Sequence, residues 1–406
     1  MNLTRRQLIS SSLASASMIT IGSSSTSLPG FLLQAADSSA KSDKSVLVVV
    51  QLSGGNDGLN TVVPFTDPVY YNQRPKLAIP KANVLSIDKS LGFHPVMQGF
   101  AELLEDDKLA VVQGVGYPNP NRSHFESMDI WHTCRRKNDI REEGWLGSIL
   151  ATQTADDSTD IPGLHLGPEK QPLALSSRSL RIASVKSLEQ FKLPADSKTL
   201  SNVVAKGDDQ GSGGLLGFVQ SSTQAAIRTS EQLEEIRSKN TSAVSYPNSA
   251  LARKLETAAQ LIDSPLATRV YYVSIDGFDT HAQQADAHTS LLRQVSSSVK
   301  TFVDDITQRG HGDRVMVMCF SEFGRRVKEN ASDGTDHGAA APMFFAGSRV
   351  KAGIHGSHPS LTDLQQGDLK HQFDFRKLYA SVLENWMKWP SADVLGGQFK
   401  PLDVFV

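Results

Sequence analysis

Cysteine is almost absent from this chain of 406 residues, which contains only Cys134 and Cys319. Cys319 lies inside the apolar run VMVMCF, which is typical of a buried strand, so a disulfide is not the expected use of these thiols. Free cysteine is among the most buried residue types. We therefore expect two inert thiols in the core.

The sequence also lacks a strong excess of charge of one sign. It has 41 Lys and Arg against 43 Asp and Glu, for a net charge of −2, and no basic run beyond Arg135-Arg136-Lys137. Nucleic acid is therefore not an expected partner. The apolar content of 39% and the charged content of 21% are typical of a soluble globular protein.

A long hydrophobic run is missing at the N-terminus, where the apolar stretch is too short and too polar to span a bilayer stably. Arg5-Arg6 precede that stretch, and the pattern resembles a twin-arginine export signal. We expect residues 1–36 to be this signal, residues 37–44 a linker, and residues 45–406 a single domain with a helical insertion at about 200–265. The signal predicts an exported protein, periplasmic or at the cell surface, with the twin-arginine export machinery as a partner and no stable transmembrane segment.

Apolar strands alternate with amphipathic helical patterns along the remaining chain. Strands are predicted at residues 45–52, 109–115, 269–275, 314–320 and 342–347. Helices are predicted from Ser123 onward and at residues 216–239, 249–262 and 288–309. Such alternation predicts an α/β fold with a central, mostly parallel sheet and helices on both faces.

Polar clusters lie at the ends of these strands. The clusters are SGGNDGLN, the loop ending in RSH, DGFDTH, SEFGR and GTDHG. The carboxyl ends of parallel strands share one edge of the sheet, where ligands bind, so we expect the clusters to converge. Carboxylates and imidazoles bind zinc, manganese or magnesium. The candidate metal ligands are Asp57, Asp279, His281, Glu322 and His337.

Each candidate also has a purely structural alternative. Asp57 could only form a turn, His281 and His337 could be polar turn residues, and Glu322 could pair with Arg325 or Arg326. Ser123 could only cap a helix, because Glu126 follows it at capping-box spacing. That role is compatible with a nucleophile, since the backbone N–H groups of a helix N-terminus favour phosphate.

The chain contains the motifs LSGGNDGLNTVVP, RSHF, WLG, GFDTH, SEFGR, GTDHG and DFRKLYA. Through this combination it closely resembles the domain of unknown function family 1501, over about residues 44–406. That family is grouped with the alkaline phosphatase-like superfamily, which includes sulfatases, phosphodiesterases and cofactor-independent phosphoglycerate mutases. The resemblance implies an alkaline phosphatase-like fold and a hydrolase with one or two divalent ions, such as zinc, manganese, magnesium or calcium. It further implies Ser123 as the nucleophile that attacks phosphorus in a small-molecule or polymer-linked ester, with Arg122 or Arg325 on the non-bridging oxygens.

Two departures from the superfamily pattern leave alternatives open. Glu322-Phe323 stands where an Asp-His pair is usual, and the DTH spacing is tighter than usual. A single metal, a different metal, or a non-catalytic periplasmic protein that binds a metal or ligand would each fit. A formylglycine sulfatase needs a C/S-x-P-x-R context, which neither Cys134 nor Ser123 has, so a sulfatase-like hydrolase using unmodified Ser123 is the weaker alternative.

Overall fold

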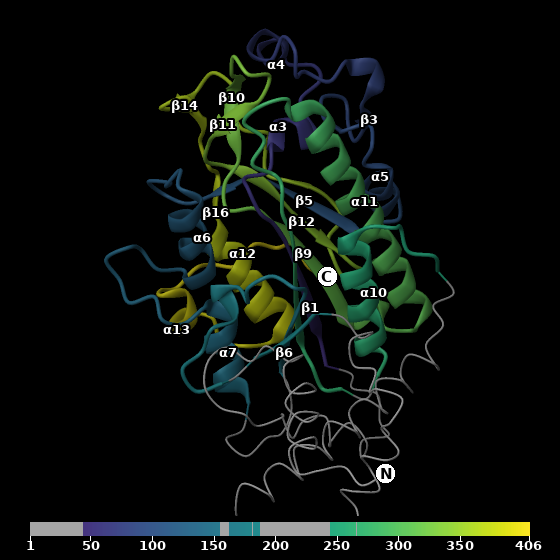
Figure 1. The fold of residues 1–406 in the computed structure, drawn as a ribbon, viewed down its shortest axis with the longest axis vertical. Coiled ribbons are helices and arrows are strands. Elements are labelled where there is room, and N and C mark those ends of the chain that lie inside the picture. The colour runs from purple at the N-terminus through teal and green to yellow at the C-terminus, as the bar shows by residue number, and fades with distance from the viewer. Residues whose placement is uncertain (1–43, 155–161, 181, 187–243, 265) are drawn as a thin grey trace, which may run out of the picture.

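The computed structural model describes residues 44–154, 162–180, 182–186, 244–264 and 266–406 (Figure 1). The predicted export signal, most of the linker, and the helix predicted at residues 216–239 lie outside the described residues. So does much of the stretch predicted as a helical insertion.

A central sheet of nine strands organises the described part of the chain, in the order β13-β5-β12-β9-β1-β8-β6-β7, with β16 also paired to β5. Its strands are β1 (Val46–Leu52), β5 (Leu109–Gly116), β6 (Gly163–Leu166), β7 (Ala183–Val185), β8 (Val270–Ile275), β9 (Val315–Phe320), β12 (Ala341–Ala346), β13 (Gly353–His355) and β16 (Phe373–Asp374). All neighbouring pairs are parallel except those of β12, which is antiparallel to β5 and to β9. The predicted α/β fold with a mostly parallel sheet is confirmed.

Helices cover both faces of this sheet (Figure 1). One layer contains α5 (Gln98–Glu105), α10 (Ala250–Ile262) and α11 (Gln284–Gln308). The other contains α6 (His124–Thr133), α7 (Trp145–Gln153), α12 (Phe375–Ala380), the π-helical η5 (Ser381–Met387) and α13 (Ala392–Leu395). Because α10 packs against α11 and β8, it forms part of a covering layer of the sheet.

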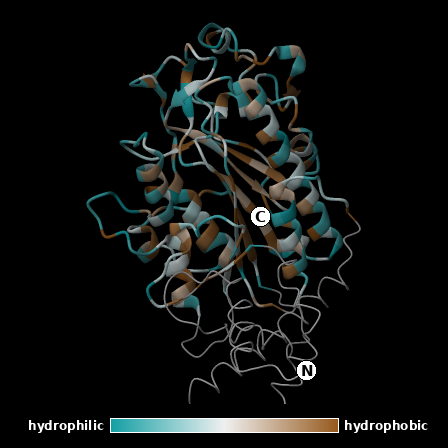
Figure 2. Ribbon diagram, in the orientation of Figure 1, coloured by the Kyte–Doolittle hydropathy of each residue, from teal (hydrophilic) through white to brown (hydrophobic). Residues whose placement is uncertain are grey.

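The strand sequences are continuous apolar runs because both faces of the sheet are buried. Along β1, Val46, Val48 and Val50 contribute to one core cluster, whereas Leu47 and Val49 contribute to the other. This alternation follows from the two-residue repeat of a strand. Figure 2 shows the hydrophobic sheet between helices that are hydrophilic on their outer faces. Cys134 and Cys319 are both buried and unpaired, as predicted.

Small elements lie beyond one end of the sheet, around β10 (Arg325–Glu329) and β11 (Thr335–His337) at the top of Figure 1. The others there are α3 (Gly58–Thr61), β2 (Val62–Val63), α4 (Pro68–Gln73), η1 (Lys81–Asn83), β3 (Leu85–Ser86), β4 (Gly92–Phe93), β14 (Leu364–Gln365) and β15 (Asp368–Leu369). Elsewhere, η2 (Leu173–Leu175) packs against α6 and α7, and η4 (Gly312–Arg314) directly precedes β9. Within the described ranges, no helix combines the length and the apolar character needed to cross a membrane.

Candidate metal centre

Four loops with polar motifs meet at one edge of the sheet, next to β10 and β11 in Figure 1. The strands β1, β8 and β9 are parallel and end at this edge. Because β12 runs antiparallel to β9, its beginning lies at the same edge. The motif GTDHG, which precedes β12, therefore meets the motifs that follow the other three strands.

The Asp279 carboxylate lies at the centre of a cluster of imidazoles. Its Oδ1 atom is 3.1 Å from Nε2 of His281, 3.1 Å from Nε2 of His337 and 3.3 Å from Nε2 of His124. His124, Asp279 and His337 each offer one ligand atom, and these three atoms lie within 4.8 Å of one another. Side chains from α6, from the loop after β8 and from β11 thus converge on one point.

Two of the imidazoles are oriented through their other ring nitrogen. Nδ1 of His124 is 2.8 Å from Oε1 of Glu322, and Nδ1 of His337 is 2.7 Å from the carbonyl oxygen of Arg122. Because a carbonyl oxygen can only accept, Nδ1 of His337 donates, and Nε2 of the neutral ring presents a lone pair to the cluster. Metal-binding histidines almost always have a second contact of this kind.

His281 faces His337 at short range, with 2.8 Å between their Nε2 atoms. Its Nδ1 atom is 3.4 Å from Oδ1 of Asp336. Without a metal ion, Nε2–H of His281 can donate to the lone pair on Nε2 of His337. With the other His281 tautomer, both Nε2 lone pairs and the Asp279 carboxylate face one point, and that arrangement fits a bound cation.

The separations around Oδ1 of Asp279 have the dimensions of a metal site, although the Nε2 atoms of His281 and His337, at 2.8 Å, are closer together than two ligands of one zinc ion. Ligand atoms about 2.0 Å from a tetrahedral zinc ion are about 3.3 Å from one another. The observed separations from Oδ1 of Asp279 are 3.1, 3.1 and 3.3 Å. The donor set of imidazoles and one carboxylate is also one that zinc accepts, so the residues fit such an ion.

Charge around Asp279 keeps its carboxylate ionised. Partial burial by itself would raise the pKa of Asp279, but the hydrogen bond and the charge of Arg325, together with the neighbouring His337 and His124, lower it far below its usual range. The hydrogen bond to Glu322 raises the pKa of His124, whereas burial lowers that of His337.

Two glycines let the loops approach closely enough to form the cluster. Gly54 has φ +116°, and a Cβ atom there would lie 2.4 Å from the backbone nitrogen of Asp279. A Cβ atom on Gly334 would lie 2.3 Å from the backbone of His281. The glycines of SGGNDG and GTDHG thus allow both loops to pack against the DTH segment.

Glu322 and Arg325, both predicted to act directly, lie behind the cluster. Glu322 is buried, and its Oε1 accepts a hydrogen bond from the backbone N–H of Gly54 at 2.9 Å in addition to its contact with His124. Arg325 is 1% exposed and donates to the carbonyls of Gly54, Gly55, Phe278 and Thr335 and to Asp279. This geometry favours positioning of His124 by Glu322 and of the loops by Arg325, and leaves Arg325 no exposed face for a substrate.

The structure does not bring the Asp57 carboxylate into the cluster. Asp57 is fully buried, and its Oδ2 atom is 2.6 Å from Nη1 of Arg74 and 2.5 Å from Nε2 of Gln284. Burial would raise the pKa of Asp57, but the Arg74 charge and hydrogen bond outweigh it and lower that pKa. An arginine thus neutralises this carboxylate, which does not fit the predicted role of a metal ligand.

Ser123 and Arg122 lie at the rim of the cluster. Ser123 is exposed and precedes α6 as its N-cap, as predicted, but its side chain makes no capping hydrogen bond. The predicted capping box is not formed, because Glu126 pairs with Arg141 instead. The Arg122 guanidinium pairs with Asp368, while the Arg122 carbonyl holds His337.

His124 belongs to the cluster although the sequence did not single it out. It directly follows Ser123 in RSHF, where the capping-box spacing drew attention to the serine. Its sequence signal, a histidine in the first turn of a helix after a strand, is weak without the spatial neighbours. Its sequence neighbour Phe125 is 87% exposed to solvent.

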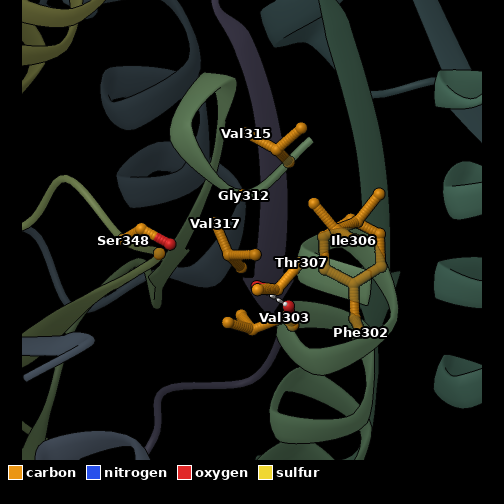
Figure 3. Close-up of a pocket in the computed structure, with 9 residues that line it drawn as sticks. Phe302, Val303, Ile306, Thr307, Gly312, Val315, Val317 and Ser348 are labelled. Carbon is orange, nitrogen blue, oxygen red and sulfur yellow. Dashed lines mark hydrogen bonds between the residues drawn. The ribbon is translucent and has the colours of Figure 1, made fainter. Parts of the chain in front are cut away.

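A small pocket at a different place does not belong to this centre (Figure 3). Apolar side chains of α11 and β9 line it, with Thr307 and Ser348, around a cavity of about 10 Å³. Ligand pockets usually measure about 300–1,000 Å³. It also contains no acid or imidazole.

Fold and site together define an α/β protein with a histidine–aspartate cluster at the carboxyl edge of its sheet. The chain belongs to the family described as "Protein of unknown function (DUF1501)", whose model matches residues 43–391. No curated protein matches the sequence.

Among solved structures, the chain is similar to Ps i-CgsB in complex with k-i-k-neocarrahexaose, at 10% identity and a TM-score of 0.41, over 89% of this chain and 76% of that chain. It is similar to the PsFucS1 sulfatase from Pseudoalteromonas sp., at 11% identity and a TM-score of 0.39, over 99% and 75% of the two chains. It is also similar to the TAB5 alkaline phosphatase, at 10% identity and a TM-score of 0.38, over 86% and 99%. These likenesses are distant and carry no argument about the substrate.

Proposed function

We propose that this protein is a metal-dependent hydrolase of phosphate esters or diesters with Ser123 as its nucleophile. The observation that carries the proposal is the convergence of three imidazole Nε2 atoms on Oδ1 of Asp279, at 3.1–3.3 Å. Oriented imidazoles and an ionised carboxylate at these separations are suited to a divalent cation.

One ion, held by His124, Asp279, His281 and His337, is the proposed stoichiometry. Asp57, the other acidic candidate, is already neutralised by Arg74. Imidazole ligands favour zinc and related transition metals, whereas magnesium and calcium prefer sites made of oxygen. When bound, a divalent cation would polarise a phosphoryl oxygen as a Lewis acid.

Ser123 has the environment of a nucleophile because both of its neighbours contact the centre. His124 contacts Asp279, and the Arg122 carbonyl contacts His337. The Ser123 hydroxyl, which makes no capping bond, attacks phosphorus, the phosphorus–oxygen bond to the alcohol breaks, and the hydroxyl proton passes to the departing alcohol oxygen. Water then cleaves the phosphorylated serine, so that one water is consumed and the alcohol is released together with phosphate from a monoester or a phosphate monoester from a diester. The backbone N–H groups of α6 favour the negative charge of the bound phosphate.

Export through the twin-arginine route is also proposed, on the pattern around Arg5-Arg6. Replacement of both by lysine, as Arg5→Lys/Arg6→Lys, is expected to retain the protein in the cytoplasm. Cell fractionation with immunodetection measures this, and an unchanged periplasmic fraction would count against the signal.

The decisive test of hydrolysis compares Ser123→Ala with the wild type on para-nitrophenyl phosphate and bis(para-nitrophenyl) phosphate. Loss of the nucleophile should lower kcat by at least about a hundredfold, a loss of the size seen when a catalytic group is removed. The exposed Ser90→Ala serves as a matched control and should retain full activity. Equal activity of Ser123→Ala and wild type would exclude Ser123, and a metal-loaded wild type without turnover would favour the non-catalytic binding protein.

Because Ser123 is exposed and makes no capping bond, Ser123→Ala should also change the free energy of unfolding by less than about 0.5 kcal/mol, which is typical of surface substitutions. Denaturant titration measures this value. It separates a loss of activity caused by the missing hydroxyl from one caused by unfolding.

A further inference from the structure

Two arginines beside the metal centre share a single buried carboxylate. Arg122 brings Nε to 2.7 Å and Nη2 to 2.6 Å from Oδ2 of Asp368. Arg326 brings its Nε only to 3.6 Å from Oδ1 of the same residue. The Asp368 side chain is 3% exposed, whereas those of Arg122 and Arg326 are 34% and 36% exposed. Two accessible guanidinium charges thus face one buried negative charge.

Arg326 has poor hydrogen bonding in this arrangement. Its Nε atom is buried without a hydrogen-bond partner among the described residues, and so is Oδ1 of Asp368. A guanidinium carries five N–H donors in a fork that matches two oxygens of a phosphate or sulfate. Asp336 attracts Arg326 electrostatically, but its carboxylate already accepts from Asn330 and faces His281.

The pair lies near the metal centre but faces away from it. The Arg122 carbonyl holds His337, and its Nη2 donates to the carbonyl of Gln366 at 3.3 Å. Arg325 pairs with His337 across β10 and β11, and its side chain reaches Asp279. Because successive side chains of a strand point to opposite faces, Arg326 is turned away from Asp279.

We propose that Arg122 and Arg326, held by Asp368, form an anion subsite that binds a phosphate or sulfate group of the substrate other than the group that is hydrolysed. As a description of the substrate, this rests on the proposed function. It defines the substrate class as esters that carry a second, non-reacting oxyanion. The subsite uses no atom of the metal cluster, so its anion binding persists without a metal.

The test is isothermal titration of chelator-treated protein with inorganic phosphate and, separately, with sulfate, at low salt. Removal of a charge-assisted hydrogen-bond donor in Arg326→Gln should weaken anion binding by about tenfold or more. Arg326→Lys, which keeps the charge, should retain part of the affinity. Arg349→Gln serves as the control, because this exposed arginine lies next to the C-terminus and should leave binding unchanged.

The preferred anion of the subsite is the one with the lower Kd in these two titrations. Equal Kd values for Arg326→Gln and wild type, or no binding to the chelated wild type, would overturn the proposal. Absence of turnover or of metal would contradict the proposed function but not the subsite. A Kd for the anion that depends on Arg326 would still support the subsite in that case. If the wild type hydrolyses esters, Arg326→Gln should raise the KM for an ester with two anionic groups and leave kcat and metal content unchanged.

Discussion

The Asp57 carboxylate and the Arg74 guanidinium form an ion pair in which both side chains are 0% exposed. Arg74 also donates to Asn60 and to the carbonyls of Arg326 and Val327, so the pair is anchored on both sides. Burial of such a pair has a desolvation cost in free energy. Removal of one partner is strongly destabilising, because it leaves the other charge buried and uncompensated. Its role is to join the loop after β1 to β10.

Arg74→Met is therefore expected to lower the free energy of unfolding by about 3–5 kcal/mol, since it strands a buried carboxylate. Asp57→Asn should leave the metal content unchanged, because Asp57 lies outside the cluster. Denaturant titration and elemental analysis check the two expectations. Loss of metal in a folded Asp57→Asn variant would return Asp57 to the ligand set and reopen a second metal.

At the same scale, the sequence predicted the types of the site residues better than their roles. Asp279, His281, Glu322 and His337 do meet, because each lies at a strand end on one edge. The sequence could not show that Arg74 reaches Asp57, since that pairing depends on how α4 returns to the loop after β1. It also could not show that His124 turns inward, because the orientation of one side chain in a first helical turn has no sequence signature.

At the scale of elements, the direction of β12 decides whether the centre can form. A continuous apolar run predicts a buried strand but not its direction, so the sequence could not show that β12 is antiparallel. The helix α11 begins at Gln284, four residues before the predicted start at residue 288, because the polar turn QADA lacks apolar periodicity. Gln284 is buried there and donates to Asp57, so its polar character serves the loop network.

Gly54 tests the close contact between the loops after β1 and β8. Gly54→Ala would place a Cβ atom 2.4 Å from the nitrogen of Asp279, so the carboxylate must move and metal affinity should fall at least tenfold. Gly353→Ala is the matched control, with a similar φ of +111° but nothing within 4 Å of the new atom. It should lose about 1–3 kcal/mol of stability from backbone strain alone and keep its metal. Metal titration measures these affinities. Equal metal affinities of Gly54→Ala and the wild type would contradict the close contact between Gly54 and Asp279.

At the scale of the whole molecule, buried neutral histidines make folding sensitive to acid. Burial lowers the pKa of His132 to about 3 and those of His94, His165 and His288 to about 4. The unfolded chain, with a histidine pKa of about 6.5, binds more protons than the folded chain below that pH. This stabilising contribution is therefore complete above pH 6.5 and is lost as the pH falls toward 4.

Each of these histidines should contribute a slope of up to about 1.4 kcal/mol per pH unit to the free energy of unfolding between pH 6 and 4. His132→Gln, which cannot titrate, should reduce the slope by about that amount relative to wild type. Denaturant titrations across this range measure it. An unchanged slope would mean that His132 accepts a proton in the folded protein.

The overall architecture followed from the sequence because two covered faces of a sheet require continuous apolar strands, and these are easily recognised in β1, β8 and β9. The helices on both faces followed from the same alternation. The small elements β10 and β11 did not, since strands of three to five residues in which every residue except Val327 is polar carry too little pattern. They nevertheless supply His337 and Arg325.

The most direct measurement is elemental analysis of the protein purified without chelator and without a metal-binding tag, beside an Asp279→Ala/His337→Ala double variant. We expect about one equivalent of zinc or a related divalent metal in the wild type and none in the folded variant, because Asp279 is the centre of the ligand cluster. Absence of metal from the wild type, or equal metal in both proteins, would contradict the proposed centre.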